Sequence, residues 1–293
     1  MNFGNLSGTI CRRTILTVSI AGAIGLFSTS TLSAQDVTPE SVLQRFVDVT
    51  GGVKEYKALK TMTTKGKVSI PMMQMEGEMD IIQDFENGMM ITDMQMPGLG
   101  TEKAGTDGET VWKFSTTQGG AQVLEDREAI QVSDQTSMSR VWDFKNYYTK
   151  MKLVGKKKIN DEECYQLDLT NKHKMKSTEF YSVETGLQVK SISTIVTPQG
   201  EIKIENFSKN YKEVGGVKMP HSSEQKMGPM TIFTELTEVK ANEKLKDNPF
   251  ELPSEVSEMV EQIKAKKAKE KAAKEKAAKE KAAKEAGSDK KDK

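Results

Sequence analysis

Apolar and polar residues alternate with a period of two through most of the chain, from Thr61 to about Lys240. This alternation is typical of strands that bury one face. It is interrupted by turn signals at Asn87-Gly88, Pro97-Gly98, Asp107-Gly108, Gly119-Gly120, Glu184-Thr185-Gly186, Pro198-Gln199-Gly200 and Gly215-Gly216. Such spacing predicts about a dozen strands in an antiparallel sheet or barrel. Because no strand–helix–strand rhythm is present, we do not expect a doubly wound fold.

Two other stretches have patterns that favour helices. Ahead of the first strand, Thr38 suits an N-cap, Pro39 suits the first helical position, and Gly51-Gly52 is a stop signal. The apolar residues between them share one helical face: Val42, Leu43, Phe46 and Val47. A shorter helix is expected over residues 54–59. The stretch 125–145 lacks the alternation, so it is also a candidate for a helix.

Two turn signals predict the register of a hairpin. If Asn87-Gly88 is a two-residue loop, Phe85 faces Met90, Ile81 faces Met94, and Met79 faces Met96. The apolar residues of both strands then lie on the same side of the sheet. At Gly215-Gly216 the same argument places Glu213 opposite Lys218, a favourable pair of charges.

The first of these hairpins carries the candidate site. Its apolar face is rich in methionine and consists of Met73, Met75, Met79, Ile81, Phe85, Met90, Met94 and Met96. Sheets more often use β-branched and aromatic residues at such positions. Because methionine is flexible and polarizable, it suits a wall that adapts to a flexible acyl chain. The alternative is a methionine-rich core covered by the first helix.

Other chemistries have less support in the sequence. Met73-Gln74-Met75 and Met94-Gln95-Met96 resemble thioether sites for Cu(I), although alternation on a strand produces this spacing by itself. His221-Ser222-Ser223-Glu224 combines catalytic residue types, but neighbours on a strand point to opposite faces. Nucleophile-elbow, metalloprotease and phosphate-loop motifs are missing from the sequence. We therefore expect neither an enzyme nor a cofactor.

Charge is distributed unevenly along the chain. The net charge of the whole chain is +1. The only charged residues in 1–34 are Arg12 and Arg13, and residues 264–293 contain 13 Lys and 6 acidic residues, so both ends are basic. The body between them is therefore acidic. Residues 1–34 have a basic start, an uncharged apolar run and small residues up to Ala34, which predicts a cleaved export signal, with a retained anchor as the alternative. Removal of Cys11 leaves Cys164, which we expect to be a buried, inert thiol.

Residues 256–293 form a tail rich in Lys, Glu and Ala. The motif Lys-Glu-Lys-Ala-Ala repeats at 269–273, 274–278 and 279–283, with favourable i,i+4 pairs. We expect a helix that begins near Ser254 and acts as a spacer. An anionic cell-envelope surface is the possible partner of the excess Lys. Nucleic acid is not expected as a partner, because the tail has no aromatic residue to stack on bases.

Several segments together resemble a known superfamily. They are Thr50-Gly51-Gly52, Asp107-Gly108-Glu109-Thr110-Val111-Trp112, Leu153-Val154-Gly155-Lys156-Lys157, Cys164-Tyr165-Gln166-Leu167, Phe180-Tyr181-Ser182-Val183-Glu184-Thr185-Gly186-Leu187, Asn210-Tyr211-Lys212-Glu213-Val214-Gly215-Gly216-Val217-Lys218-Met219-Pro220, Val239-Lys240-Ala241-Asn242 and Asn248-Pro249-Phe250-Glu251-Leu252-Pro253. Over residues 37–255 the chain resembles the LolA- and LolB-like outer-membrane lipoprotein-sorting proteins. The resemblance implies an unclosed antiparallel β-barrel with covering helices and an apolar cavity that shields lipoprotein acyl chains in the periplasm. The superfamily also contains sensors and scaffolds.

The predicted architecture is mainly β, of the α+β class. A signal peptide (1–34) precedes a LolA-like half-barrel domain (35–255), and a charged helical or disordered tail follows (256–293). The predicted function is that of an exported, monomeric carrier for the acyl chains of lipoproteins or lipids. A sensor or scaffold of the same fold is the main alternative, and a Cu(I)-binding protein is the third.

Overall fold

A computed structural model describes residues 37–98, 100–117, 119–197, 200–245, 247–266 and 269–270. The chain divides into two units, residues 1–36 and 37–293, and all described residues belong to the second. The predicted signal peptide and most of the predicted tail therefore lie outside the described residues. Among the helices that are described, none is both long and apolar enough to span a membrane.

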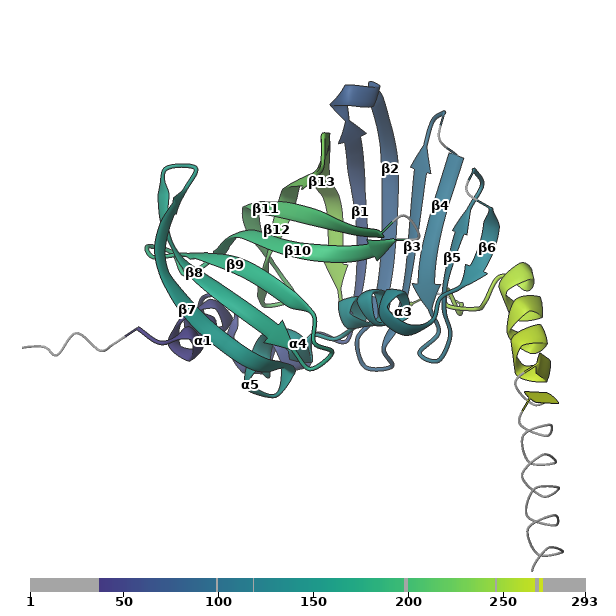
Figure 1. The fold of residues 1–293 in the computed structure, drawn as a ribbon, viewed down its shortest axis with the longest axis horizontal. Helices are drawn as coiled ribbons and strands as arrows, with labels where there is room; N and C mark the ends of the chain where they lie inside the picture. The colour runs from purple at the N-terminus through teal and green to yellow at the C-terminus, as the bar shows by residue number, and fades with distance from the viewer. Residues whose placement is uncertain are drawn as a thin grey trace, which may run out of the picture. The chain divides into compact units, whose positions relative to one another are not determined.

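One antiparallel sheet dominates the described part of the chain (Figure 1). Its thirteen strands lie in the order β6-β5-β4-β3-β2-β1-β13-β12-β11-β10-β9-β8-β7. Their bounds are β1 Thr61–Ile70, β2 Met75–Asp84, β3 Met89–Met96, β4 Gly100–Thr106, β5 Val111–Ser115, β6 Gly120–Val123, β7 Tyr148–Ile159, β8 Glu162–Asn171, β9 Lys176–Ser182, β10 Gln188–Thr197, β11 Gly200–Val214, β12 Val217–Met227 and β13 Met230–Ala241. Because β6 and β7 are the two edges and do not pair, the sheet is open, which confirms the predicted unclosed barrel.

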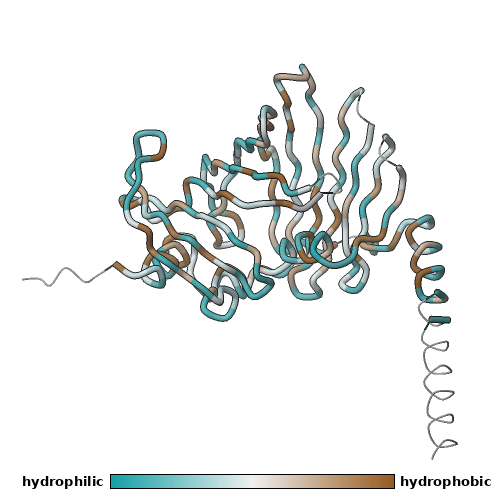
Figure 2. The backbone as a smooth tube through the Cα atoms, viewed as in Figure 1, coloured by the Kyte–Doolittle hydropathy of each residue, from teal (hydrophilic) through white to brown (hydrophobic). Residues whose placement is uncertain are grey.

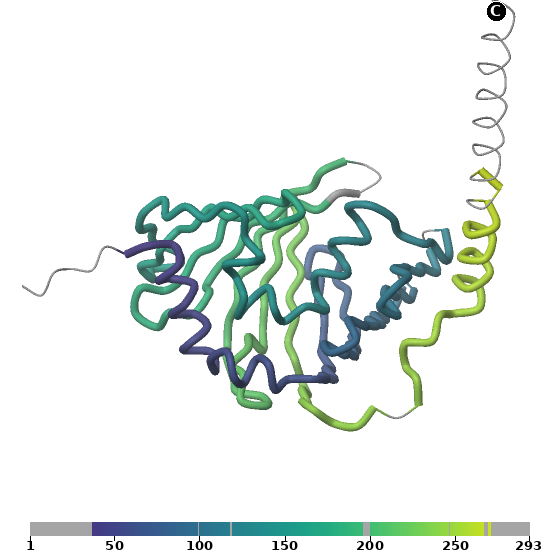
Figure 3. Tube along the Cα trace, turned by 90° about the horizontal axis from the view of Figure 1, so that it is seen from below, coloured from purple at the N-terminus to yellow at the C-terminus, as the bar shows by residue number. Residues whose placement is uncertain are grey.

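The helices form where the alternation is missing. Their bounds are α1 Pro39–Val49, α2 Gly52–Ala58, η1 Pro71–Met73, α3 Asp126–Ser133, η2 Asp134–Thr136, α4 Ser139–Trp142 and α5 Phe144–Tyr147. Thr38 is the N-cap of α1, and its side chain and that of Ser41 cap each other's backbone N–H groups. The predicted first helix and its cap are confirmed. A further helix covers residues 254–266, as predicted near Ser254, and lies beside β5 and β6 (Figure 1 and Figure 3).

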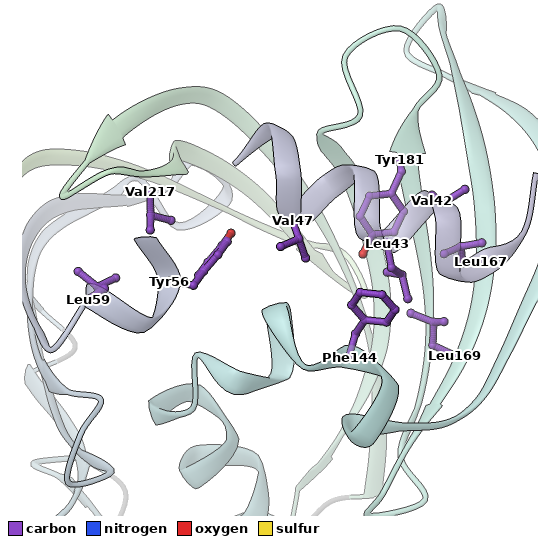
Figure 4. Packing of buried hydrophobic residues seen from close by; sticks show 10 residues of the cluster. All are labelled: Val42, Leu43, Val47, Tyr56, Leu59, Phe144, Leu167, Leu169, Tyr181 and Val217. Carbon is purple, nitrogen blue, oxygen red and sulfur yellow. The ribbon is translucent and has the colours of Figure 1, made fainter. Parts of the chain in front are cut away.

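Helices α1, α2 and α5 pack on one face of the sheet, which we call the helix face (Figure 4). Residues of this core alternate along their strands with residues of the opposite face, and the hydropathy colours alternate accordingly (Figure 2). The buried members are Val42, Leu43, Val47, Tyr56, Leu59, Phe144, Leu167, Leu169, Tyr181 and Val217. Burial of this apolar surface supplies the main force that holds the helices to the sheet.

A smaller core lies on the opposite face. Ile159, Cys164, Phe180 and Phe207 are its buried members. The Lys190 ammonium lies 4.6 Å from the centroid of the Phe207 ring and also pairs with Glu205 at 2.6 Å. Long lysine side chains thus cover these rings while their charges reach solvent.

The structure corrects the register of the β2–β3 hairpin. The loop contains four residues, 85–88, and Met79 faces Met94, Ile81 faces Thr92, and Gln83 faces Met90. The predicted pairs Met79–Met96, Ile81–Met94 and Phe85–Met90 are therefore wrong by two positions. The Asp84 carboxylate explains the longer loop, because it accepts hydrogen bonds from the backbone N–H groups of Glu86 and Asn87 (3.0 and 2.9 Å).

Two other predictions on the strands have clear outcomes. Since a shift of two residues preserves the face of every side chain, the prediction that both apolar sets share one face holds. At the other hairpin, Glu213 faces Lys218, as predicted.

Candidate functional site

Eight apolar residues form one cluster on the helix face, at the end of the sheet where β1, β2, β3 and β13 meet. We call this the methionine cluster. Its buried members are Val68, Ile70 and Met96, and the partly buried residues Met75, Met79, Met94, Met230 and Ile232 pack against them. Among the described residues, no α-helical side chain belongs to this cluster. The cluster is therefore an apolar surface on which the helices do not pack.

Strand pairing explains how the cluster forms. Ile70 faces Met75 across β1 and β2, and Met79 faces Met94 across β2 and β3. On the other side of β1, Ser69 pairs with Phe233, which brings Ile232 beside Ile70. Side chains directly opposite each other lie within contact distance, so four strands contribute to one continuous surface.

Four of the eight predicted ligand-binding residues lie in this cluster: Met75, Met79, Met94 and Met96. Ile81 is half-buried and Met90 is buried on the same face, nearer to the β2–β3 loop. Phe85 lies in that loop and packs against the helix core.

The prediction that Met73 belongs to the strand is wrong. It belongs to η1, where its side chain is 41% exposed. Pro71 begins this turn, and Gln74 ends it in the left-handed conformation, with φ of 53°. This local geometry interrupts the alternation between β1 and β2.

Sequence reasoning missed Val68, Ile70, Met230 and Ile232. Val68 and Ile70 alternate with Lys67 and Ser69, so the period-two signal predicts that they share a face. The sequence does not indicate that β1 pairs with β13, because those strands are far apart along the chain.

The β1–β13 pairing divides the sheet into two arms, strands β1–β6 and strands β7–β13. Helix α3 connects these two arms by polar contacts. Gln131 donates a hydrogen bond to the Thr194 carbonyl on β10 (3.2 Å), and Lys113 of β5 lies 3.7 Å from Glu128. Gln83 of β2 donates to the carbonyl of Gln135 in η2 (3.1 Å). No residue of α3 is fully buried, and these polar contacts join α3 and η2 to both arms.

The segment after α3 is anchored through Asp134. Its carboxylate accepts a 2.6 Å hydrogen bond from the Tyr147 hydroxyl and lies 3.6 Å from the His173 ring. Burial, together with the hydrogen bond to Asp134, raises the pKa of Tyr147 to about 12. Tyr147 therefore remains a neutral donor over the physiological range.

A hollow of about 1110 Å³ lies against the opposite face of the same strands. Lys67 and Ser69, which flank Val68, and Glu76 and Glu78, which flank Gly77, line it. Its polar lining comes also from Gln95, Thr101, Lys209, Asn210, Ser222, Ser223, Glu224, Thr234 and Glu235, and its apolar lining from Val68, Met96, Pro97 and Phe233. Of the eight predicted residues, Met96 alone borders it. The hollow is therefore of mixed character, and it shares Val68 and Met96 with the methionine cluster.

Other candidate chemistry is placed as follows. Cys164 is a free, fully buried thiol, and burial raises its pKa to about 11. His221 is buried, and its Nδ1 lies 3.1 Å from the Met219 carbonyl oxygen. Within the described residues, no group of three or more His, Cys, Asp or Glu side chains is placed to hold a metal ion.

No protein-family model matches the sequence, and no characterised protein matches it by sequence. Solved structures are similar to it in fold. One is a DUF1329 family protein from Desulfovibrio piger, with a TM-score of 0.50 and 9% sequence identity, covering 73% of this chain and 98% of that one.

Two further solved structures are similar to this chain. One is a LolA superfamily protein from Nitrosomonas europaea, with a TM-score of 0.48 and 15% identity over 74% of this chain and 98% of that one. The other is a putative outer membrane lipoprotein-sorting protein domain from Vibrio parahaemolyticus, with a TM-score of 0.39 and 9% identity over 71% and 97%. Structures similar to this chain thus include a LolA superfamily protein. At such identities the likeness concerns the fold.

Proposed function

We propose that this protein is an exported, non-enzymatic carrier that holds acyl chains of lipoproteins or lipids on the methionine cluster. The observation that carries the proposal is a partly exposed apolar cluster that lies beyond the packed helices. Contiguous exposed apolar surface in a protein commonly marks a binding site. Export rests on residues 1–34, whose pattern is typical of a signal peptide.

The chemistry of the cluster suits a long, flexible ligand. Each methylene that is removed from water contributes about 0.8 kcal/mol, so about ten buried methylenes correspond to roughly 8 kcal/mol before the cost of association. Five of the cluster's residues are methionines, whose unbranched side chains adapt to different ligand shapes. Of the remaining predicted residues, Ile81 and Met90 extend the proposed site along the same hairpin, and Met73 lies at its outer end in η1, whereas Phe85 packs against the helix core.

The test is Met79→Asp combined with Met94→Asp. Two carboxylates at facing positions make the surface unfavourable for a hydrocarbon chain, so the affinity for cis-parinaric acid should fall at least about tenfold. Fluorescence of that fatty acid measures binding, and circular dichroism checks the fold. Val53→Asp combined with Val154→Asp adds the same charge at two exposed apolar positions and should leave the affinity unchanged.

Several outcomes would count against the proposal. Retained binding in the Met79→Asp, Met94→Asp variant would mean that the ligand lies elsewhere. Failure of the unaltered protein to bind the fatty acid would favour a sensor or scaffold. If the charged variant does not fold, Met79→Ala with Met94→Ala should still weaken binding. Uptake of Cu(I) that Met94→Leu and Met96→Leu abolish would instead favour the copper alternative.

We further propose that the tail is a spacer, with an anionic cell-envelope surface as its possible partner. Its excess of lysine over acidic residues favours such a surface over a neutral one.

A further inference from the structure

Three turns lie at the end of the sheet that carries the methionine cluster. The segment 71–74 joins β1 to β2, the segment after Met96 joins β3 to β4, and residues 228–229 join β12 to β13. The turn η1 contacts β13. A Cβ atom on Gly98 would lie 3.9 Å from the Met75 methyl group, so the β3–β4 turn adjoins the start of β2. The three turns therefore form one rim.

Apart from Gln74, the described residues of this rim are apolar or small, and none of them carries a charge. We call them the apolar rim: Pro71, Met72, Met73, Pro97, Gly98, Met227, Gly228, Pro229 and Met230. Met72 is 63% exposed and Met73 is 41% exposed. In a chain in which 29% of residues are charged, this uncharged set of turns is a distinct surface feature.

The rim is continuous with the methionine cluster. Met230 belongs to both, and Met75 of the cluster follows the η1 turn directly. A hydrocarbon chain that leaves the cluster at this end would cross the exposed methionines of η1 before it reaches water. The exposed end of the sheet thus extends the proposed acyl-binding surface outward.

The charges around the rim indicate what kind of surface it fits. The rim itself has no lysine or arginine, and its neighbour Lys226 is paired with Glu224 at 3.1 Å. Exposed Glu76 lies close to the η1 turn. Proteins that bind anionic lipids by charge do so through clustered basic residues, which this rim lacks. Its chemistry fits the apolar interior of a neutral bilayer.

We propose that the apolar rim docks on the surface of a lipid bilayer, with Met72 and Met73 entering the interface. Docking would let an acyl chain pass between the membrane and the methionine cluster with little exposure to water. This inference rests on the proposed acyl-binding function. It predicts membrane binding driven by apolar burial, which is insensitive to salt and does not require anionic lipid.

The experiment measures co-sedimentation of the protein with phosphatidylcholine vesicles, together with its binding of cis-parinaric acid without vesicles. Met72→Glu should reduce the vesicle-bound fraction at least about fivefold and leave fatty-acid affinity unchanged, because a charge in the interface opposes insertion and Met72 lies outside the proposed acyl-binding site. Val154→Glu, at another exposed apolar position, is the matched control and should sediment like the unaltered protein. A chain that ends at residue 266 should also still sediment, since the rim and not the tail makes the contact.

The two readouts separate this inference from the proposed function. Fatty-acid binding without vesicle binding would overturn rim docking and leave the carrier proposal in place. Unchanged sedimentation of the Met72→Glu variant would also overturn it, as would sedimentation that needs anionic lipid and disappears at high salt. Vesicle binding that depends on the rim, without fatty-acid binding, would support docking and contradict the carrier.

Discussion

Individual side chains in this sheet have different roles on its two faces. On the helix face, the five methionines of the cluster offer flexible, uncharged surface. On the opposite face, Lys190 covers aromatic rings and pairs with Glu205, and Cys164 is enclosed completely. One face thus carries flexible apolar side chains, while the other is held by specific pairs.

The buried thiol of Cys164 should be unreactive in the folded protein. Its pKa is raised to about 11, mainly by burial, so at pH 8 roughly one molecule in a thousand carries the reactive thiolate. In a chain with Cys11→Ser, labelling by a disulfide reagent should be slow in buffer and rapid in guanidinium. An added Val154→Cys provides an exposed thiol for comparison, and equal native rates at the two sites would contradict this prediction.

The carboxylate of Glu205 should make stability depend on acid pH. Hydrogen bonds from Lys190 and Lys203 lower its pKa from 4.5 to about 2. Because the folded pKa is below the unfolded one, its contribution is fully present above about pH 4.5 and is lost as pH falls through about 2. Glu205→Gln should reduce the free energy of unfolding by about 1 kcal/mol at pH 7 and by almost nothing at pH 2.

Thermal unfolding across this pH range measures the effect of Glu205→Gln. Glu201→Gln is a suitable control, because the Arg127–Glu201 pair is exposed and should contribute little at any pH. If the difference in stability between the Glu205→Gln variant and the unaltered protein stays constant from pH 7 to pH 2, the two lysines do not stabilise the fold by pairing with ionised Glu205.

Turns decide the register of the strands in the candidate site. The Asp84 carboxylate accepts hydrogen bonds from two backbone N–H groups and from the Asn87 amide (2.7 Å), and this network favours a four-residue loop. The register in turn pairs Met79 with Met94 at the centre of the methionine cluster. A loop on one end of a hairpin thus determines which side chains of the candidate site face each other.

Asp84→Ala should destabilise the protein by about 1–2 kcal/mol, because two loop N–H groups lose their acceptor. Urea unfolding measures the change. Glu86→Ala in the same loop removes only an exposed pair with Lys60 and should cost less than about 0.5 kcal/mol. Equal effects of the two substitutions would mean that the Asp84 network does not stabilise the loop.

The molecule as a whole depends on the pairing of its first and last strands. β1 pairs with β13, so the two arms of the sheet are joined only after the chain has been completed to residue 241. Residues beyond the sheet also belong to the folded unit, because Phe250 is buried and Val256, in the helix over residues 254–266, is fully buried. We therefore place the end of the packed structure within this helix.

Val256→Ala should lower the free energy of unfolding by about 1–3 kcal/mol, since it leaves a cavity in a packed site. Glu258→Ala, two residues further along the same helix, changes an exposed side chain and should have almost no effect. Truncation after residue 266 should likewise leave stability unchanged. A loss of stability on truncation that equals the loss from Val256→Ala would show that the tail itself packs on the domain.

The sequence by itself determined the local features of this protein. Alternation indicates the strands and the face of each side chain, and Thr38, Pro39 and Gly51 indicate the first helix, because these signals depend on neighbouring residues alone. The residues of the methionine face were predicted in the same way, and the two-residue error in register did not alter the face on which they lie.

Only the tertiary structure decided which of those residues meet. Pairing of β1 with β13 adds Val68, Ile70, Met230 and Ile232 to the cluster, and packing of the helices separates Phe85 from it. The hollow on the opposite face depends on the same pairing. Contacts of this kind join strands far apart in the chain, and their choice depends on the burial of the whole core, which no local pattern encodes.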